Sequence, residues 1–180
     1  RLPAEHYEVG SEIAAPDAIL VRSAKMHDML IPSSVQGIGR AGAGTNNIPV
    51  GEMSKRGIVV FNSPGANANA VKELVLTGML MAARNIAPAM RFVDGLQGDD
   101  ATLSKVVEDG KKHFAGIELP GRTLGIIGLG AIGGMVADTA LKLGMKVIGY
   151  DPEITVDAAW KLSSDVKRAH NVDDLFKHSD

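Results

Sequence analysis

The chain has 180 residues, 45% of them hydrophobic and 22% charged, which is typical of a soluble globular protein of one or two domains and excludes fibrous and disordered classes. A formal net charge of −2 provides no field that would attract nucleic acid or an anionic membrane, so we expect small-molecule partners. The absence of cysteine excludes disulfides and thiolate metal sites, and the apolar stretches are too short to span a bilayer. We therefore expect a cytoplasmic protein with no membrane span, no nucleic-acid partner and no metal site.

The first third of the chain alternates short apolar runs with turn residues. Runs at 6–9, 17–21, 35–40 and 57–61 predict four strands, and Pro49 suits the first position of a short helix that continues through Arg56. We expect the first two strands to lie in a sheet that is buried on both faces. This alternation indicates a parallel sheet layered with helices, because parallel neighbours need a crossover connection.

A long apolar stretch from about Ala68 to Leu96 predicts a largely buried helix. Pro88 should kink or divide this helix, since proline lacks an N–H donor and crowds the preceding turn. The polar segment at 97–116 predicts one exposed helix within a solvated connector.

The last third contains a strand–helix–strand unit. We expect a strand at 122–128, a helix at 131–143 that stops at Gly144, and a strand at 146–150. The charged segments 156–168 and 172–177 predict further helices.

Three glycines of this unit, Gly128, Gly130 and Gly133, form the pattern GxGxxG between the first strand and the helix. Gly128 allows a tight turn, Gly130 lets the backbone approach a pyrophosphate, and Gly133 lets the helix pack closely on the strand. The pattern alone is weak evidence. Its place between a strand and a helix predicts a dinucleotide site, with the phosphates at the start of the helix.

Asp151 ends the second strand of the unit. A carboxylate there can accept hydrogen bonds from both adenosine ribose hydroxyls and would repel a 2′-phosphate, which favours NAD over NADP. The alternative is that Asp151 only forms the turn before Pro152.

A second glycine-rich turn, at 40–47, follows a predicted strand of the first third. It would place bare amides and the Arg40 guanidinium at the carboxyl edge of the sheet, where open α/β sheets bind ligands. Arg22 and Ser23 follow an earlier strand at the same edge, so two arginines could hold a carboxylate or phosphate. Lys72, near the start of the long helix, adds a third cation. Each of these cations is also compatible with an ordinary surface residue.

The five histidines show no metal-ligand spacing and no neighbouring carboxylate of an acid–base pair, so none is assigned a role. The sequence has neither a GxSxG elbow nor a Walker lysine motif, which argues against the common hydrolases and NTPases.

Taken together, these segments resemble the D-isomer-specific 2-hydroxyacid dehydrogenases, and within them the phosphoglycerate-oxidising branch. The resemblance runs in the same order and spacing through 17–24, 39–47, 57–64, 73–74 and 116–152. It implies an α/β protein with a flavodoxin-like substrate domain at 1–65, followed at 66–180 by a doubly wound Rossmann NAD-binding domain with a long linking helix, both incomplete in this chain. The implied reaction is oxidation of 3-phosphoglycerate to 3-phosphohydroxypyruvate with NAD, in serine biosynthesis.

The resemblance also implies site residues. The expected substrate-binding residues are Arg22, Ser23, Arg40, Ala41, Gly42 and Lys72. The expected cofactor-binding residues are Ala43, Val71, Thr77, Gly128, Gly130, Ala131, Ile132, Gly133, Asp151 and Pro152. Ala43 stands where relatives often have threonine, and Lys72 where many have a small residue. The family's catalytic Arg, Glu and His lie further along than Asp180, so no catalytic residue is assigned in this chain.

The residues after Asp151 are too few for the nicotinamide half of a dinucleotide site, so we expect a parent enzyme of about twice this length. We expect a homo-oligomer formed through the Rossmann domain. Two other functions remain open. One is another 2-hydroxyacid dehydrogenase acting on glycerate, glyoxylate or lactate, for which the three cations would be unnecessarily positive. The other is an NAD-binding corepressor without turnover.

Overall fold

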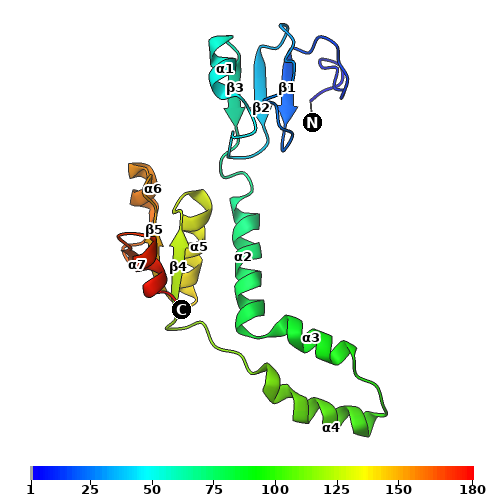
Figure 1. Cartoon of the computed structure of the whole chain (residues 1–180), viewed down its shortest axis with the longest axis vertical. Coiled ribbons are helices and arrows are strands. Elements are labelled where there is room, and N and C mark those ends of the chain that lie inside the picture. Colours follow the sequence, from blue (N-terminus) through cyan, green and yellow to red (C-terminus); the bar gives the residue numbers. More distant parts are fainter. Residues whose placement is uncertain (1) are drawn as a thin grey trace. The chain divides into compact units, whose positions relative to one another are not determined.

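The computed structural model describes residues 2–180, and Arg1, the first residue of the expected substrate domain, lies outside them. The chain divides into two compact units, with the boundary between Asn67 and Ala68 (Figure 1). In the part of the chain that is described, no helix has both the length and the apolar content needed to cross a bilayer.

The first unit contains a parallel three-stranded sheet. Its strands are β1 (Ala18–Val21), β2 (Gly37–Arg40) and β3 (Val59–Asn62), in the order β1-β2-β3. Three of the four expected strands are therefore confirmed. The strand expected at 6–9 is wrong, because the N–H groups of His6 and Tyr7 both donate to the carbonyl of Pro3 and close a turn there.

Helix α1 (Val50–Lys55) packs against this sheet and buries Ile38 and Met53, which are 1% and 0% exposed. Pro49 is the N-cap residue of α1, one position before the first helical residue, where it was expected. The expectation of a sheet buried on both faces is wrong within this unit. Leu20 and Phe61 share one face through their common partner Gly39, and they are 74% and 64% exposed.

The second unit contains another parallel sheet, formed by β4 (Thr123–Ile127), β5 (Lys146–Tyr150) and β6 (Val166–Arg168) in the order β4-β5-β6. Val147 of β5 packs with buried residues of helix α5 (Ala131–Lys142). The next residue, Ile148, packs with Leu175 of helix α7 (Val172–Lys177). Successive strand residues point to opposite faces, so α5 and α7 cover opposite faces of the sheet. The parallel α/β architecture predicted from the sequence is confirmed.

The segment 156–168 is not a single helix as expected. Helix α6 spans only Val156–Lys161, and β6 follows it. The polar residues at 163–165 interrupt the helix, and Val166 then pairs with Val147. A three-residue strand with one apolar side chain is too short to show the alternation that identifies strands in a sequence.

The long apolar stretch forms two helices, α2 (Ala68–Ala83) and α3 (Ile86–Asp94), as the presence of Pro88 predicts. Pro88 lies in the first turn of α3, where its missing N–H needs no partner, and Asn85 takes a left-handed conformation with φ of 51°. Helix α4 (Asp100–Gly110) and a short 3₁₀ turn, η1 (Lys111–Phe114), follow, which confirms the helix expected at 97–116. In Figure 1, α3 and α4 leave the end of α2 and fold back as a hairpin.

The expected burial of the long helix is wrong for this chain. On α2, Leu74 is 72% exposed and Leu80 is 46% exposed, while Ala68 and Ala83 at its two ends are buried. The reason is that α5 covers only part of the surface of α2. The remaining apolar surface has no cover within the second unit.

Candidate functional site

The glycine-rich turn lies at the carboxyl end of β4 and leads into α5. Gly128 has φ of +88°, a left-handed conformation that favours glycine, and its N–H donates to the carbonyl of Tyr150 at 2.8 Å. A Cβ on Gly133 would lie only 1.9 Å from the carbonyl oxygen of Gly128. The turn and the first turn of α5 therefore pack too closely for any other residue at position 133.

The start of α5 is open to a ligand. Gly130 is the N-cap residue of α5, no side chain caps the helix there, and a Cβ on Gly130 would meet no atom within 4 Å. Ala131 and Ile132, the first two helical residues, are exposed. Uncapped N–H groups and the positive end of the helix dipole favour an anion at this position.

Asp151 braces the turn from the end of β5. Its Oδ2 accepts the N–H of Leu129 at 2.8 Å, and its Oδ1 accepts the N–H of Glu153 at 3.0 Å. Leu129 is 7% exposed, and it packs on Gly149, where a Cβ would approach its side chain to 2.7 Å. Asp151 thus forms the expected turn and also anchors the glycine loop, and each of its oxygens keeps acceptor capacity for a ribose hydroxyl.

These residues fit a dinucleotide. The turn is bare at Gly130, the N–H groups of α5 are free for the pyrophosphate, and Asp151 lies one strand away at the same sheet edge for the ribose. Pro152 follows Asp151 and is exposed. When it is bound, NAD supplies the acceptor for a hydride.

The first unit presents polar groups at the carboxyl edge of its own sheet. Arg22 and Ser23 follow β1 and are exposed, and Arg40 ends β2. The bare amides expected after β2 are only partly present. The N–H of Ala41 donates to Val21 and that of Gly42 donates to Ser63 Oγ, each at 2.8 Å.

Further along this loop the amides are free. Over the described residues, no hydrogen bond is found for the N–H of Ala43, Gly44 or Thr45. Ala43 and Gly44 are exposed. The part of the loop that offers donors to a ligand is therefore 43–45.

The guanidinium of Arg40 has no hydrogen-bond or ion-pair partner among residues 2–67. Its Nε is buried and makes no hydrogen bond, and among residues 2–180 no carboxylate lies within ion-pairing distance of its guanidinium. A Cβ on Gly42 would lie 1.9 Å from Arg40 Nη1, so the guanidinium packs directly beneath the glycine loop. A partly buried cation without a counterion is suited to an anionic ligand.

Sequence reasoning did not predict that residues at the end of β3 hold this loop. Ser63 Oγ accepts from the N–H of Gly42 and donates to the carbonyl of Arg40 at 3.2 Å. Asn62 Nδ2 donates to the carbonyl of Ala43 at 2.7 Å. The only signal was positional, since Asn62 ends β3 and Ser63 follows it at the same edge of the sheet.

Three expected site residues lie on α2, in the second unit. Lys72 Nζ donates to Asn69 Oδ1 at 2.6 Å, and Thr77 Oγ1 donates to the carbonyl of Glu73 at 2.9 Å. Val71 is half-buried. Contact of these residues with substrate or cofactor stays a prediction.

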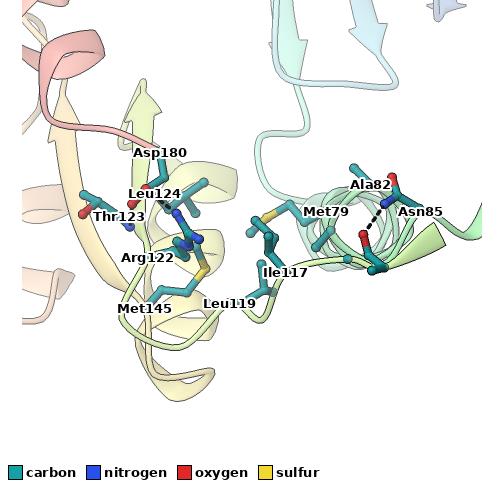
Figure 2. Close-up of a pocket in the computed structure, with 13 residues that line it drawn as sticks. Met79, Ala82, Asn85, Ile117, Leu119, Arg122, Thr123, Leu124, Met145 and Asp180 are labelled. Carbon is teal, nitrogen blue, oxygen red and sulfur yellow. Dashed lines mark hydrogen bonds and ion pairs between the residues drawn. The ribbon is translucent and has the colours of Figure 1, made fainter. Parts of the chain in front are cut away.

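A hollow of the second unit with a volume of about 450 Å³ lies away from the glycine turn (Figure 2). It is lined by the end of α2, the segment 115–119 and the amino end of β4, with Met79, Leu124 and Met145 among its apolar walls. Arg122 and Asp180 form an ion pair of 3.0 Å at its rim. None of the expected site residues lines this pocket.

Comparison with known proteins supports the dinucleotide site. The family model described as the NAD-binding domain of D-isomer-specific 2-hydroxyacid dehydrogenases matches residues 76–180. The chain belongs to this family. The matched residues lie in its second unit, and the α/β class and the NAD cofactor expected from the sequence are confirmed.

The relatives differ in the activity for which they are named. The chain is 38% identical over 96% of its length to the D-3-phosphoglycerate dehydrogenase of Methanocaldococcus jannaschii. It is 39% identical over 98% of its length to the hydroxypyruvate reductase of Thermotoga maritima, of which it covers 53%. The NAD-bound 3-phosphoglycerate dehydrogenase of Entamoeba histolytica is similar in structure, with a TM-score of 0.60 and 30% identity over 91% of this chain and 44% of that one. The chain covers 31% of the length of the Methanocaldococcus relative.

Proposed function

We propose that the protein oxidises an anionic D-2-hydroxy acid with NAD, and that this acid is 3-phosphoglycerate, which yields 3-phosphohydroxypyruvate for serine biosynthesis. The hydride leaves C2 of the acid for NAD, and the hydroxyl proton leaves to a base. Residues 1–65 form the substrate domain and residues 66–180 the first part of the cofactor domain in this proposal. Neither the base nor the arginine that holds the substrate carboxylate is assigned to a residue of this chain.

The unpaired guanidinium of Arg40 is the observation that carries the choice of an anionic acid. It packs beneath a loop whose free amides, at 43–45, also favour an anion. Arg22 and Ser23 are exposed at the same edge and provide further donors. A substrate with both a phosphate and a carboxylate uses such a set more fully than one with a carboxylate alone.

The cofactor is held by the glycine turn, the start of α5 and Asp151. Val71, Thr77 and Ala43 are proposed to add contacts to NAD, and Lys72 to add a cation for the substrate. Because the reaction depends on NAD and a phosphorylated metabolite, we place the protein in the cytoplasm.

Two experiments test the substrate. The first measures NADH formation by the full-length protein with 3-phosphoglycerate, glycerate and D-lactate. We expect kcat/KM to be at least about tenfold higher for the phosphorylated acid, since a charge-assisted hydrogen bond contributes about 1.5–3 kcal/mol. Equal rates on phosphorylated and plain acids would remove 3-phosphoglycerate.

The second experiment replaces Arg40 with methionine, which keeps an unbranched side chain and removes the charge. We expect the KM for 3-phosphoglycerate to rise about tenfold or more and the KM for NAD to stay within about twofold. An unchanged KM for the acid would show that Arg40 is an ordinary partly buried arginine.

A plain hydroxy acid is the second candidate, because the hydroxypyruvate reductase of Thermotoga maritima is as similar as the phosphoglycerate dehydrogenases. A corepressor that binds NAD without turnover is the third. The absence of NADH formation with all three acids, together with intact NAD binding, would favour the corepressor.

A homo-oligomer formed through the second unit completes the proposal. Ile86, Met90 and Val93 recur at helical spacing on α3 and are 41%, 58% and 57% exposed, which makes an apolar stripe for a second copy of the chain to cover. Light scattering of the full-length protein should give a multiple of the subunit mass, and Met90→Glu should reduce it. A monomeric wild-type protein would contradict this proposal.

A further inference from the structure

Asn47 joins two loops at the carboxyl edge of the first unit. Its Nδ2 donates to the carbonyl of Ala24 at 2.9 Å and reaches that of Arg22 at 3.5 Å. Its own carbonyl accepts the N–H of Met26 at 2.8 Å. One residue of the loop after β2 thus holds the loop after β1 at several points.

The chemistry of this contact requires an amide. Carbonyl oxygens only accept hydrogen bonds, so the nitrogen of the Asn47 side chain must face Ala24 and Arg22, and the oxygen must face away. Asn47 is 8% exposed, and within residues 2–180 its Oδ1 has no hydrogen-bond partner. A buried acceptor without a partner lowers stability, and an apolar residue would avoid that cost. What the Asn47 side chain contributes at this position is therefore its donor bonds to the loop after β1.

The two carbonyls that face Asn47 lie on either side of Ser23. The peptide groups around Ser23 are consequently fixed, while the side chains of Arg22 and Ser23 remain exposed. Met26, 1% exposed, anchors the far end of the same loop in the core. Without the amide of Asn47, the stretch between β1 and Met26 would be linked to the loop after β2 only at its two ends, by the backbone bonds of Val21 with Ala41 and of Met26 with Asn47.

We propose that Asn47 is a positioning residue for the acid substrate. It holds the Arg22–Ala24 loop in the geometry in which Arg22 and Ser23 meet the acid, and it touches neither the acid nor NAD. This inference rests on the proposed function, in which that loop lines the substrate site. It predicts that loss of the amide weakens binding of the acid while leaving binding of NAD intact.

Ser34 supplies a matched control. Its Oγ donates to the carbonyl of Pro16 at 2.9 Å and, like Asn47 Nδ2, makes a side-chain bond to a backbone carbonyl of the first unit. Pro16 and Ser34 precede β1 and β2, so this bond lies at the amino edge of the sheet, opposite the proposed site. Ser34→Ala removes a comparable hydrogen bond where no substrate is expected.

The test compares Asn47→Asp, Asn47→Ala and Ser34→Ala in the full-length protein. Asn47→Asp keeps the shape, removes the donor and introduces a carboxylate, whereas Asn47→Ala removes the donor without adding a charge. We expect both Asn47 variants to raise the KM for 3-phosphoglycerate about tenfold or more, with a smaller change in kcat, since small displacements of positioning groups have large effects. The KM for NAD should stay within about twofold. Ser34→Ala should leave both constants unchanged even if it lowers the melting temperature.

Hydrogen exchange provides a second measurement. Amides at 22–26 should exchange faster in the Asn47 variants and at the wild-type rate in Ser34→Ala. Asn47→Ala, which is neutral, carries the comparison if a buried charge prevents Asn47→Asp from folding. A KM for the acid that stays at the wild-type value in a folded Asn47 variant would overturn the inference and leave the proposed function standing. If the wild-type protein turns over no acid, the proposed function fails and this inference fails with it.

Discussion

Replacing Gly133 with alanine forces apart two elements of the proposed cofactor site, the glycine turn and the first turn of α5. The new Cβ would lie 1.9 Å from the carbonyl oxygen of Gly128, and real Cβ contacts are not found below 3.0 Å. The first turn of α5 and the glycine turn must therefore separate by about 1.1 Å. Both contacting atoms are anchored, because the oxygen is backbone and Gly133 lies within a helix.

This separation has two consequences. Overpacking of this kind costs about 1–3 kcal/mol of stability. An N–H group that moves by about 1 Å also leaves hydrogen-bonding range of a phosphate oxygen, and a hydrogen bond to a charged group is worth about 1.5–3 kcal/mol. We expect Gly133→Ala to weaken NAD binding by about tenfold or more and to lower the melting temperature.

Two neighbouring glycines act as controls. A Cβ on Gly134 would meet its nearest atom, Leu162 Cδ2, at an ordinary 3.5 Å, so Gly134→Ala should change neither NAD affinity nor stability for the worse. A Cβ on Gly130 would meet nothing within 4 Å, so Gly130→Ala should keep the stability. It should lower the affinity for NAD by filling the space that we propose for the pyrophosphate. Calorimetric titration with NAD and thermal unfolding measure both effects. Gly133→Ala with wild-type affinity and wild-type melting temperature would refute the reasoning.

Two further predictions concern the segment between the two sheets. A Cβ on Gly116 would lie 2.1 Å from the carbonyl oxygen of Ala83, which accepts the N–H of Ile117. Gly116→Ala should therefore lower the free energy of unfolding, measured by urea titration, by about 1–3 kcal/mol. An unchanged urea midpoint would contradict this packing. Hydrogen bonds from the side chain and the N–H of Thr102 hold the pKa of Asp99 below its usual value of 3.8. The Asp99 carboxylate therefore stabilises α4 fully at pH values above 3.8, and this stabilisation is lost as the pH falls through the lowered pKa. Asp99→Asn keeps an N-cap residue and removes the charge. In this variant, the hydrogen-exchange rates of the α4 amides should depend less on pH in the acid range than they do in the wild-type protein. Identical pH profiles in the two proteins would contradict the role of the Asp99 carboxylate at the start of α4.

Local backbone rules predicted the cofactor half of the molecule well. Glycine is required at three positions of the strand–helix–strand unit: Gly128 and Gly144 have a left-handed backbone, and Gly133 packs closely on Gly128. The spacing of these glycines therefore predicted the unit. Pro88 likewise marked the division between α2 and α3. These effects act within a few residues, which is why a sequence pattern reveals them.

Features that depend on partners distant in the sequence were missed. The strand β6 exists because Val166 pairs with Val147, and a three-residue run shows no periodicity of its own. The run at 6–9 has a composition typical of strands, but it pairs with none of the strands in the described part of the chain. The bonds of Ser63 and Asn62 to the loop after β2 form because β3 lies next to β2 in the sheet. That order of strands was not predicted from the sequence.

The role of Asp151 was only half visible from the sequence. Its place after β5 suggested either a ribose ligand or a turn residue, and the structure adds its bond to the N–H of Leu129. Removing the carboxylate is therefore expected to disturb the glycine loop as well as the proposed ribose contact. The affinity for NAD alone does not separate these two effects, whereas the ratio of NAD to NADP affinity does.

The most direct test of the account is the ratio of the dissociation constants for NADP and NAD, measured by calorimetric titration in the wild-type protein and in Asp151→Ala. A carboxylate facing the ribose repels a 2′-phosphate, so we predict that the wild-type protein binds NAD at least about tenfold more tightly than NADP. In Asp151→Ala the ratio should fall toward one, although both cofactors bind more weakly. A ratio that is the same in both proteins would show that Asp151 only shapes the turn and would contradict the assignment of this edge as the ribose site.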